Sequence, residues 1–145
     1  MPFEPTKVTV AVTVHGTIEN VWTSWTDPAR IMEWNAASDD WHCPRAENDL
    51  RVGGTFSARM EAKDGSMGFD FGGTYQEVIH HSRITYLMNG EDRRAVEILF
   101  VQEGDEVRVT EIFDAESENP IELQRTGWLA ILKRFKEFVE RNRDE

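Results

Sequence analysis

The chain has 145 residues, the length of one domain, and its 39% hydrophobic and 30% charged residues indicate a folded core rather than disorder. Its formal net charge of −11 argues against nucleic acid and anionic membrane surfaces as partners, because both would repel it. With one cysteine, Cys43, and neither a secretory signal nor a membrane-spanning run, we expect a cytoplasmic protein without disulfides.

The first part of the chain predicts one strand followed by two short helices. Residues 6–14 alternate strictly between apolar and small polar positions, which is typical of a half-buried strand. Thr17 is a helix cap, and the apolar positions after it have helical spacing: Ile18, Val21, Trp22 and Trp25. Asp27 and Pro28 then supply the cap and the first residue of a second short helix.

The middle of the chain predicts about six strands joined by short turns. Trp41 to about Arg45 is expected to be a short edge strand, because Pro44 lacks an N–H, and residues 47–49 are expected to form a turn. Gly53-Gly54 is expected to mark a bulge or a close backbone approach, and Gly72-Gly73 a bulge, both inside strands. The other strands alternate over the ranges 56–63, 67–79, 84–89, 94–102 and 106–114, with turns at Asp64-Gly65, Asn89-Gly90 and Gly104-Asp105.

The chain closes with a long amphipathic helix from Asn119 to about Asn142. Asn119 is expected to be its cap, Pro120 its first residue and Glu122 the acid of a capping box. Such a helix spans roughly 30 Å, and its broad apolar face needs a sheet to lie on. That face comprises Ile121, Trp128, Leu132, Phe135 and Val139, widened by Leu129, Ile131 and Phe138.

Five segments together resemble a known family. They are residues 18–34 (Ile18-Glu19-Asn20-Val21-Trp22, then Thr26-Asp27-Pro28 and Trp34), 49–56, 60–65, 73–78, and Gly127-Trp128. In order and spacing the chain resembles the START-like (SRPBCC) superfamily, and within it the branch named for activators of the heat-shock protein 90 ATPase. The resemblance implies a single START-like domain over residues 1–145 with the α+β helix-grip fold. In that fold a curved antiparallel sheet of about seven strands wraps a long C-terminal helix, with two short helices after the first strand.

The resemblance also implies a cavity between the sheet and the long helix. Aromatic and methionine residues at inward positions are numerous, which favours an apolar pocket, although ordinary core packing is the alternative for most of them. Gly127, inside the helix, fits either a tight packing contact or a cavity. The candidate ligand-binding residues are Trp25, Trp34, Trp41, Phe56, Met60, Phe69, Phe71, Tyr86, Met88, Phe100, Glu111, Phe113 and Trp128.

Glu111 is the most unusual of these candidates. It shares its strand phase with Val107, Val109 and Phe113, so the alternation points it inward. A buried carboxylate without a partner is costly and tends to protonate, which would make it a pocket acid. The alternatives, which the sequence alone favours, are a bulge that shifts the register or a position at the rim of the sheet. Its suggested partners are Arg59 and Arg94.

No metal or cofactor is predicted. The adjacent His80 and His81 are expected to face opposite ways, and Cys43 has no activating partner in the sequence. The first functional hypothesis is a protein that binds a small apolar or aromatic molecule. The second, which the name of the branch implies, is a chaperone-interacting module. The third is a cavity enzyme, such as a polyketide-cyclase-like protein or a hydrolase, in which Glu111 would be the group to test.

Overall fold

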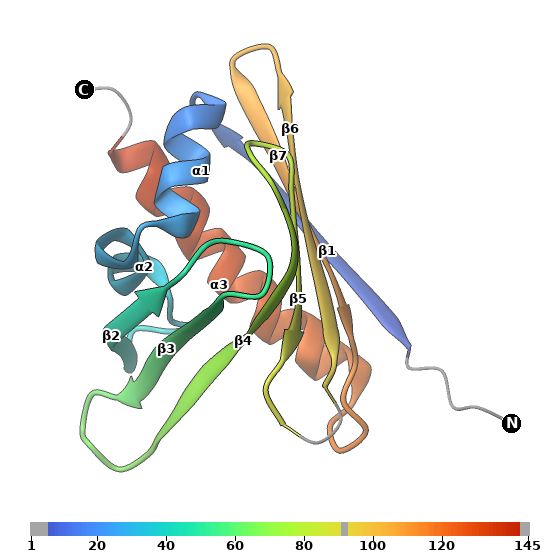
Figure 1. Cartoon of the computed structure of the whole chain (residues 1–145). Coiled ribbons are helices and arrows are strands. Elements are labelled where there is room, and N and C mark those ends of the chain that lie inside the picture. The colour runs from blue at the N-terminus through green and yellow to red at the C-terminus, as the bar shows by residue number, and fades with distance from the viewer. Residues whose placement is uncertain (1–5, 91–92, 143–145) are drawn as a thin grey trace, which may run out of the picture.

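A curled antiparallel sheet grips a long helix in the computed structural model, which describes residues 6–90 and 93–142 (Figure 1). The sheet has seven strands in the order β1-β7-β6-β5-β4-β3-β2, so the predicted helix-grip fold is confirmed. The elements are β1 (Lys7–His15), α1 (Ile18–Thr26), α2 (Pro28–Trp34), β2 (Trp41–Asn48), β3 (Thr55–Ala62), β4 (Gly68–Ile79), β5 (Arg83–Met88), β6 (Ala95–Glu103), β7 (Glu106–Asp114) and α3 (Ile121–Arg141).

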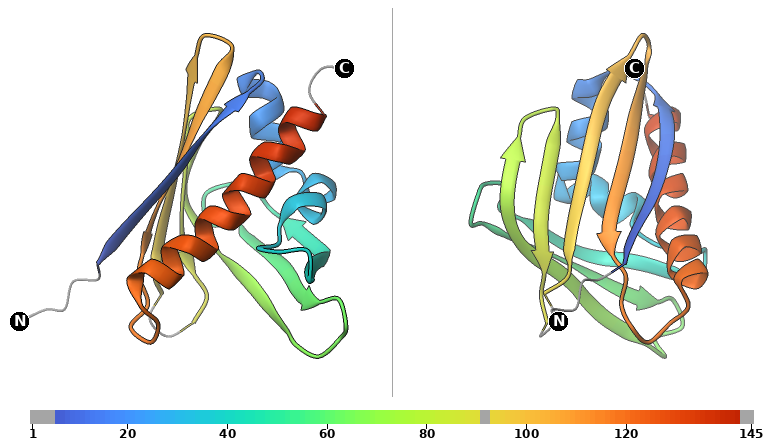
Figure 2. Two further views of the ribbon diagram at one scale, coloured as in Figure 1. Left: turned by 180° about the vertical axis from the view of Figure 1, so that it is seen from behind. Right: turned by 90° about the vertical axis from the view of Figure 1, so that its right-hand side faces the viewer.

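All three helices lie on one side of the sheet. Figure 2 shows α3 running diagonally across that side, with α1 and α2 beside its C-terminal half and β2–β4 curling beneath. Apolar residues of α3 such as Leu132, Phe135 and Val139 are fully buried against the sheet and the short helices. Because the last strand, β7, pairs with the first strand, β1, segments from both halves of the chain form the same wall of the core. Among the described residues, no helix is long and apolar enough to cross a bilayer.

The two short helices begin as predicted, but the long one does not. The Thr17 side chain accepts the N–H of Asn20, and the Asp27 side chain accepts that of Ala29. The predicted Asn119 cap is wrong, because α3 begins after Pro120 without a side-chain cap, and the Asn119 amide donates to Glu116 instead.

A different side chain anchors the start of α3. The Gln124 carbonyl oxygen accepts the N–H of Glu116 at 2.8 Å, and its amide donates to the Asn119 carbonyl oxygen at 2.8 Å. These bonds fix the loop after β7 to the first turn of the helix, so the end of the sheet is joined directly to the helix that it grips.

Strand β2 is longer than predicted. It runs to Asn48 rather than Arg45, so the turn expected at residues 47–49 is wrong. The Asn48 side chain donates to the Thr26 carbonyl oxygen at 2.7 Å and accepts the Tyr75 hydroxyl at 2.6 Å, which holds the end of the strand in place. Pro44 falls in the break of register between His42 and Arg45 on this edge strand, where no ladder N–H is needed.

The glycine pairs mark close backbone approaches rather than bulges. Gly53-Gly54 lie in the loop before β3, not in a strand, and exchange backbone hydrogen bonds with Tyr75 at 2.9 Å. A Cβ at Gly54 would lie 2.1 Å from the Asp49 carbonyl oxygen. Gly72-Gly73 do lie in β4, but the register breaks between Tyr75 and Glu77, so the bulge expected at the glycines is wrong.

Gly127 is neither tightly packed nor part of the cavity described below, since a Cβ added there meets no atom within 4 Å. We therefore expect Gly127→Ala to raise the free energy of unfolding by about 1 kcal/mol, because alanine is the better helix former. Urea denaturation monitored by circular dichroism measures this. An unchanged or lower value would show that the glycine serves a backbone geometry that alanine does not tolerate.

Candidate functional site

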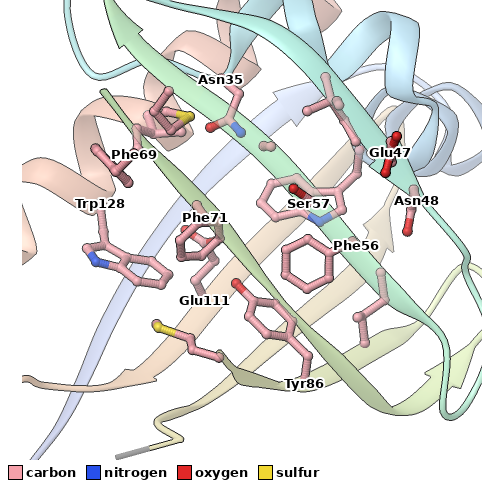
Figure 3. Close-up of a pocket in the computed structure, with 18 of the residues that line it drawn as sticks. Asn35, Glu47, Asn48, Phe56, Ser57, Phe69, Phe71, Tyr86, Glu111 and Trp128 are labelled. Carbon is pink, nitrogen blue, oxygen red and sulfur yellow. The ribbon is translucent and has the colours of Figure 1, made fainter. Parts of the chain in front are cut away.

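A cavity of about 360 Å³ lies between the inner face of the sheet and α3 (Figure 3). Its walls come from all three helices, from β2–β5 and from β7, and they are mainly apolar. The volume is in the range of small-molecule sites in proteins. The void that the resemblance implied is therefore present in this chain.

Most of the candidate ligand-binding residues line this cavity. Their side chains are presented by consecutive elements that curl around one space, because inward positions of β3, β4 and β5 face the same side as the apolar stripe of α3. The candidates found in the lining are Trp25, Trp34, Phe56, Met60, Phe69, Phe71, Tyr86, Met88, Glu111 and Trp128.

Three candidates, Trp41, Phe100 and Phe113, do not line the cavity, contrary to expectation. Phe113 is fully buried and stacks on Trp128, with ring centroids 4.0 Å apart and planes at 9°, so it supports the wall from behind. Phe100 packs edge-on against Trp22 at 5.2 Å, under α1. Trp41 contacts Phe69 at 6.0 Å beside the small cluster of β2 and β3. Phe100 and Phe113 do point inward, as their strand positions predicted, but other side chains fill the space above them.

The sequence missed the polar part of the lining. Tyr75 occupies an inward position of β4, so the strand alternation could have identified it. Asn35 and Glu116 come from loops, where no alternation indicates the direction of a side chain. Ser57 alternates with the inward positions of β3 and still reaches the cavity, because this edge of the sheet is strongly curled. The missed polar residues are Asn35, Glu47, Asn48, Ser57, Tyr75, Arg94, Glu116 and Gln124.

Glu111 is buried at the sheet side of the cavity, with 6% of its surface exposed. Strand β7 pairs with both neighbours in unbroken register, with Val10 and Ile98 directly beside Glu111. The interpretations as a bulge or a rim position are therefore wrong. Burial raises the pKa of the Glu111 carboxyl from 4.5 to about 8, so it is mostly protonated at neutral pH.

Neither suggested partner forms an ion pair with Glu111. Arg59 of β3 instead forms ion pairs with Glu61 of the same strand and Asp70 of β4. Arg94 lines the same cavity and donates to the Asp114 carbonyl oxygen at 3.4 Å. Within the described part of the chain, the Glu111 carboxyl forms no hydrogen bond or ion pair. It is therefore a buried polar group that faces the cavity without a protein partner.

Two tyrosines share this region and differ in their partners. The Tyr75 hydroxyl donates to the Asn48 side-chain oxygen at 2.6 Å, so its hydrogen-bonding capacity is used. The Tyr86 hydroxyl has no hydrogen bond among the described residues, and in Figure 3 it points into the cavity, on the side where Glu111 lies. Burial raises the pKa of both phenols, so both stay neutral at physiological pH.

Among the described residues, the cysteine and the histidines do not form a site. Cys43 is buried, and burial raises the pKa of its thiol, which disfavours the reactive thiolate. His80 and His81 do not face opposite ways as expected, because they lie in the turn after β4, where their rings stack 3.7 Å apart. In residues 6–90 and 93–142, no three His, Cys, Asp or Glu side chains are grouped to hold a metal ion.

The family comparison gives a match over most of the chain. The model for "Activator of Hsp90 ATPase homolog 1-like protein" matches residues 15–140, which include every element lining the cavity. This supports the resemblance drawn from the sequence segments. The comparison with curated proteins finds no match.

Solved structures support the same grouping. The chain is 43% identical to the AHSA1-like protein from Aeromonas hydrophila, with a TM-score of 0.87 over 94% of this chain and 93% of that one. It is 51% identical to Chr148 from Cytophaga hutchinsonii, with a TM-score of 0.80 over the same shares. CV1439 from Chromobacterium violaceum has the same fold at 23% identity, with a TM-score of 0.84 over 94% of this chain and 99% of that one.

Proposed function

This chain belongs to the Activator of Hsp90 ATPase homolog 1-like family, and we propose that it binds a small apolar or aromatic molecule in the cavity between the sheet and α3. The observation that carries the proposal is the cavity of about 360 Å³, walled by aromatic and methionine side chains. Apolar walls supply binding energy through burial, and a few polar groups orient the ligand. The family's description also names a chaperone ATPase, so a chaperone partner stays a second candidate, but the cavity favours ligand binding.

Filling the cavity tests this proposal. Ala58 of β3 lines the cavity and is buried, so we expect Ala58→Phe to occupy much of the space and weaken ligand binding at least tenfold. Ala62, on the same face of the same strand, is also buried but does not line the cavity. Ala62→Phe is therefore the matched control, and it should retain binding.

Two measurements read out the result. Native mass spectrometry of the purified protein detects retained small molecules, and the shift of the melting temperature with a panel of one- and two-ring aromatic compounds measures binding. We expect wild type and Ala62→Phe to respond to the same compounds, and Ala58→Phe to respond to none. If wild type retains no molecule and no compound shifts its melting temperature, the proposed function is wrong.

A further inference from the structure

Two polar groups at the sheet side of the cavity have no protein partner among the described residues. The Glu111 carboxyl comes from β7 and the Tyr86 hydroxyl from β5, with 6% and 7% of the residue surface exposed. Val10 and Ile98, beside Glu111 in the sheet, are apolar and buried, so they enclose its side chain laterally, and Glu111 lines the cavity. Both groups open onto the cavity, where a ligand with a complementary group would supply the hydrogen bonds that the protein does not.

Aromatic rings surround the space that these two groups face. Phe71 lies edge-on to Trp128, with centroids 6.2 Å apart at 81°, and Phe56 lies edge-on to Tyr86 at 4.7 Å and 74°. Figure 3 shows these four rings around the interior of the cavity, and they come from four different elements. The faces of aromatic rings carry partial negative charge and attract organic cations.

The charged groups around the cavity also favour a cation. Glu111 comes from β7, Glu116 from the loop after it, and Glu47 from β2, whereas Arg94, before β6, is the cation of the lining. The lining residues of α1, α2 and α3 carry no formal charge, and the tyrosines of β4 and β5 are neutral. Because Glu111 is protonated in the empty cavity, two acidic residues, Glu47 and Glu116, stand against one guanidinium, and together with a chain charge of −11 they disfavour an anionic ligand.

We propose that the cavity selects a small arylalkylamine, whose ammonium group pairs with the Glu111 carboxylate and donates a hydrogen bond to the Tyr86 hydroxyl oxygen, while its ring packs among Phe56, Phe71 and Trp128. This inference rests on the proposed function and gives its ligand a chemical class. A buried ammonium–carboxylate pair recovers the cost of desolvating both charges only when hydrogen bonds and ring faces complete its surroundings, and this cavity offers both.

The pairing has a consequence for protons. In the empty cavity burial raises the pKa of Glu111 to about 8, so the carboxyl holds its proton at pH 7. An alkyl ammonium group, with a pKa of about 10, stays charged throughout this range. Binding of the ammonium group therefore releases the Glu111 proton to solvent. Only empty protein with an ionised Glu111 binds without this release, and the fraction of such protein grows with pH. The affinity for an arylalkylamine should rise roughly 50-fold between about pH 6 and pH 8 and then level off.

Three probes that share an indole ring test the charge preference. Tryptamine carries an ammonium group, tryptophol a neutral hydroxyl, and indolepropionate a carboxylate. Isothermal titration calorimetry at about pH 6, 7 and 8, in buffers of different ionisation enthalpy, measures affinity and the protons released. We expect tryptamine to bind at least tenfold tighter than tryptophol at pH 8, to release nearly one proton at pH 7, and indolepropionate to bind most weakly.

Glu111→Gln provides the residue-specific test, because glutamine has nearly the same shape as the protonated carboxyl. We expect this variant to keep tryptophol binding and to lose both the preference for tryptamine and its pH dependence. Glu137→Gln removes one exposed acid of α3 outside the cavity and should behave as wild type. Tighter binding of tryptophol than of tryptamine, affinity for tryptamine that falls as pH rises, or unchanged selectivity in Glu111→Gln would overturn the inference while leaving the proposed function intact. If none of the three probes binds, the inference also fails, and the wider aromatic panel decides the proposed function.

Discussion

Glu111→Gln is expected to raise the free energy of unfolding by a few kcal/mol at about pH 9 and to change it little near pH 5. Burial raises the pKa of Glu111 from 4.5 to about 8, so the folded protein holds a proton that the unfolded chain releases. Below the unfolded pKa both states are protonated, and the stability from this group is fully present. This stability is lost as pH rises through the folded pKa. In that range the carboxyl must either take up a proton on folding or be buried in its charged form, and both cost free energy.

The size of the effect follows from the width of that window. Each pKa unit corresponds to about 1.4 kcal/mol, so the wild-type free energy of unfolding falls by up to about 5 kcal/mol from this group between pH 4.5 and 8. Glutamine has no proton to lose, so the fall should be absent in Glu111→Gln. Urea denaturation at a series of pH values from 5 to 9 measures both curves. Glu137→Gln, an exposed acid, should follow wild type.

Parallel curves for wild type and Glu111→Gln would contradict this expectation. They would mean that water or a counterion reaches the carboxyl in the folded state and keeps its pKa near the ordinary value. The same measurement bears on the ligand. A carboxyl that is costly to ionise in the empty protein is the group that a bound ammonium stabilises, so stability and binding should respond to pH in opposite directions.

The sheet could be predicted from the sequence because its inner strands alternate without interruption. Ile84, Tyr86 and Met88 of β5 are all buried, as the pattern requires. The start of α3 could not be predicted, because the local sequence favours Asn119 as the cap and Pro120 as the first helical residue, whereas hydrogen bonds of the Gln124 side chain anchor the preceding loop instead. The extension of β2 to Asn48 likewise depends on partners in α1 and β4.

The site was only partly predictable for a different reason. Strand phase tells which side chains point inward, but it does not tell whether space or another side chain lies above them. Phe71 borders the cavity, whereas Phe113, also inward, is covered by the stacked ring of Trp128. For Glu111 the phase was correct, and the unbroken register of β7 removed the alternatives. Polar lining from loops, such as Asn35, has no periodic signal.

Phe135→Ala is expected to cost about 3–5 kcal/mol of unfolding free energy. Phe135 of α3 is fully buried, and its ring meets Trp25 and Trp34 edge-on, each with centroids 4.9 Å apart. The substitution removes the ring that fills the angle between the three helices, and little can collapse into the space because both tryptophans are held by other contacts. Urea denaturation measures the cost, and Leu123→Ala on the exposed face of α3 should cost no more than about 0.5 kcal/mol.

The same substitution links the core to the cavity. Trp25 and Trp34 both line the cavity, so Phe135 supports part of its wall from behind. Removing that ring should extend the void toward α1 and α2, and we expect Phe135→Ala to accept larger aromatic compounds than wild type at temperatures where it is still folded. Phe135→Leu, which restores most of the volume, should recover more than half of the lost stability. A cost below about 1 kcal/mol for Phe135→Ala would mean that α3 does not rest on the two short helices, and the wall of the proposed ligand site would then lack its support.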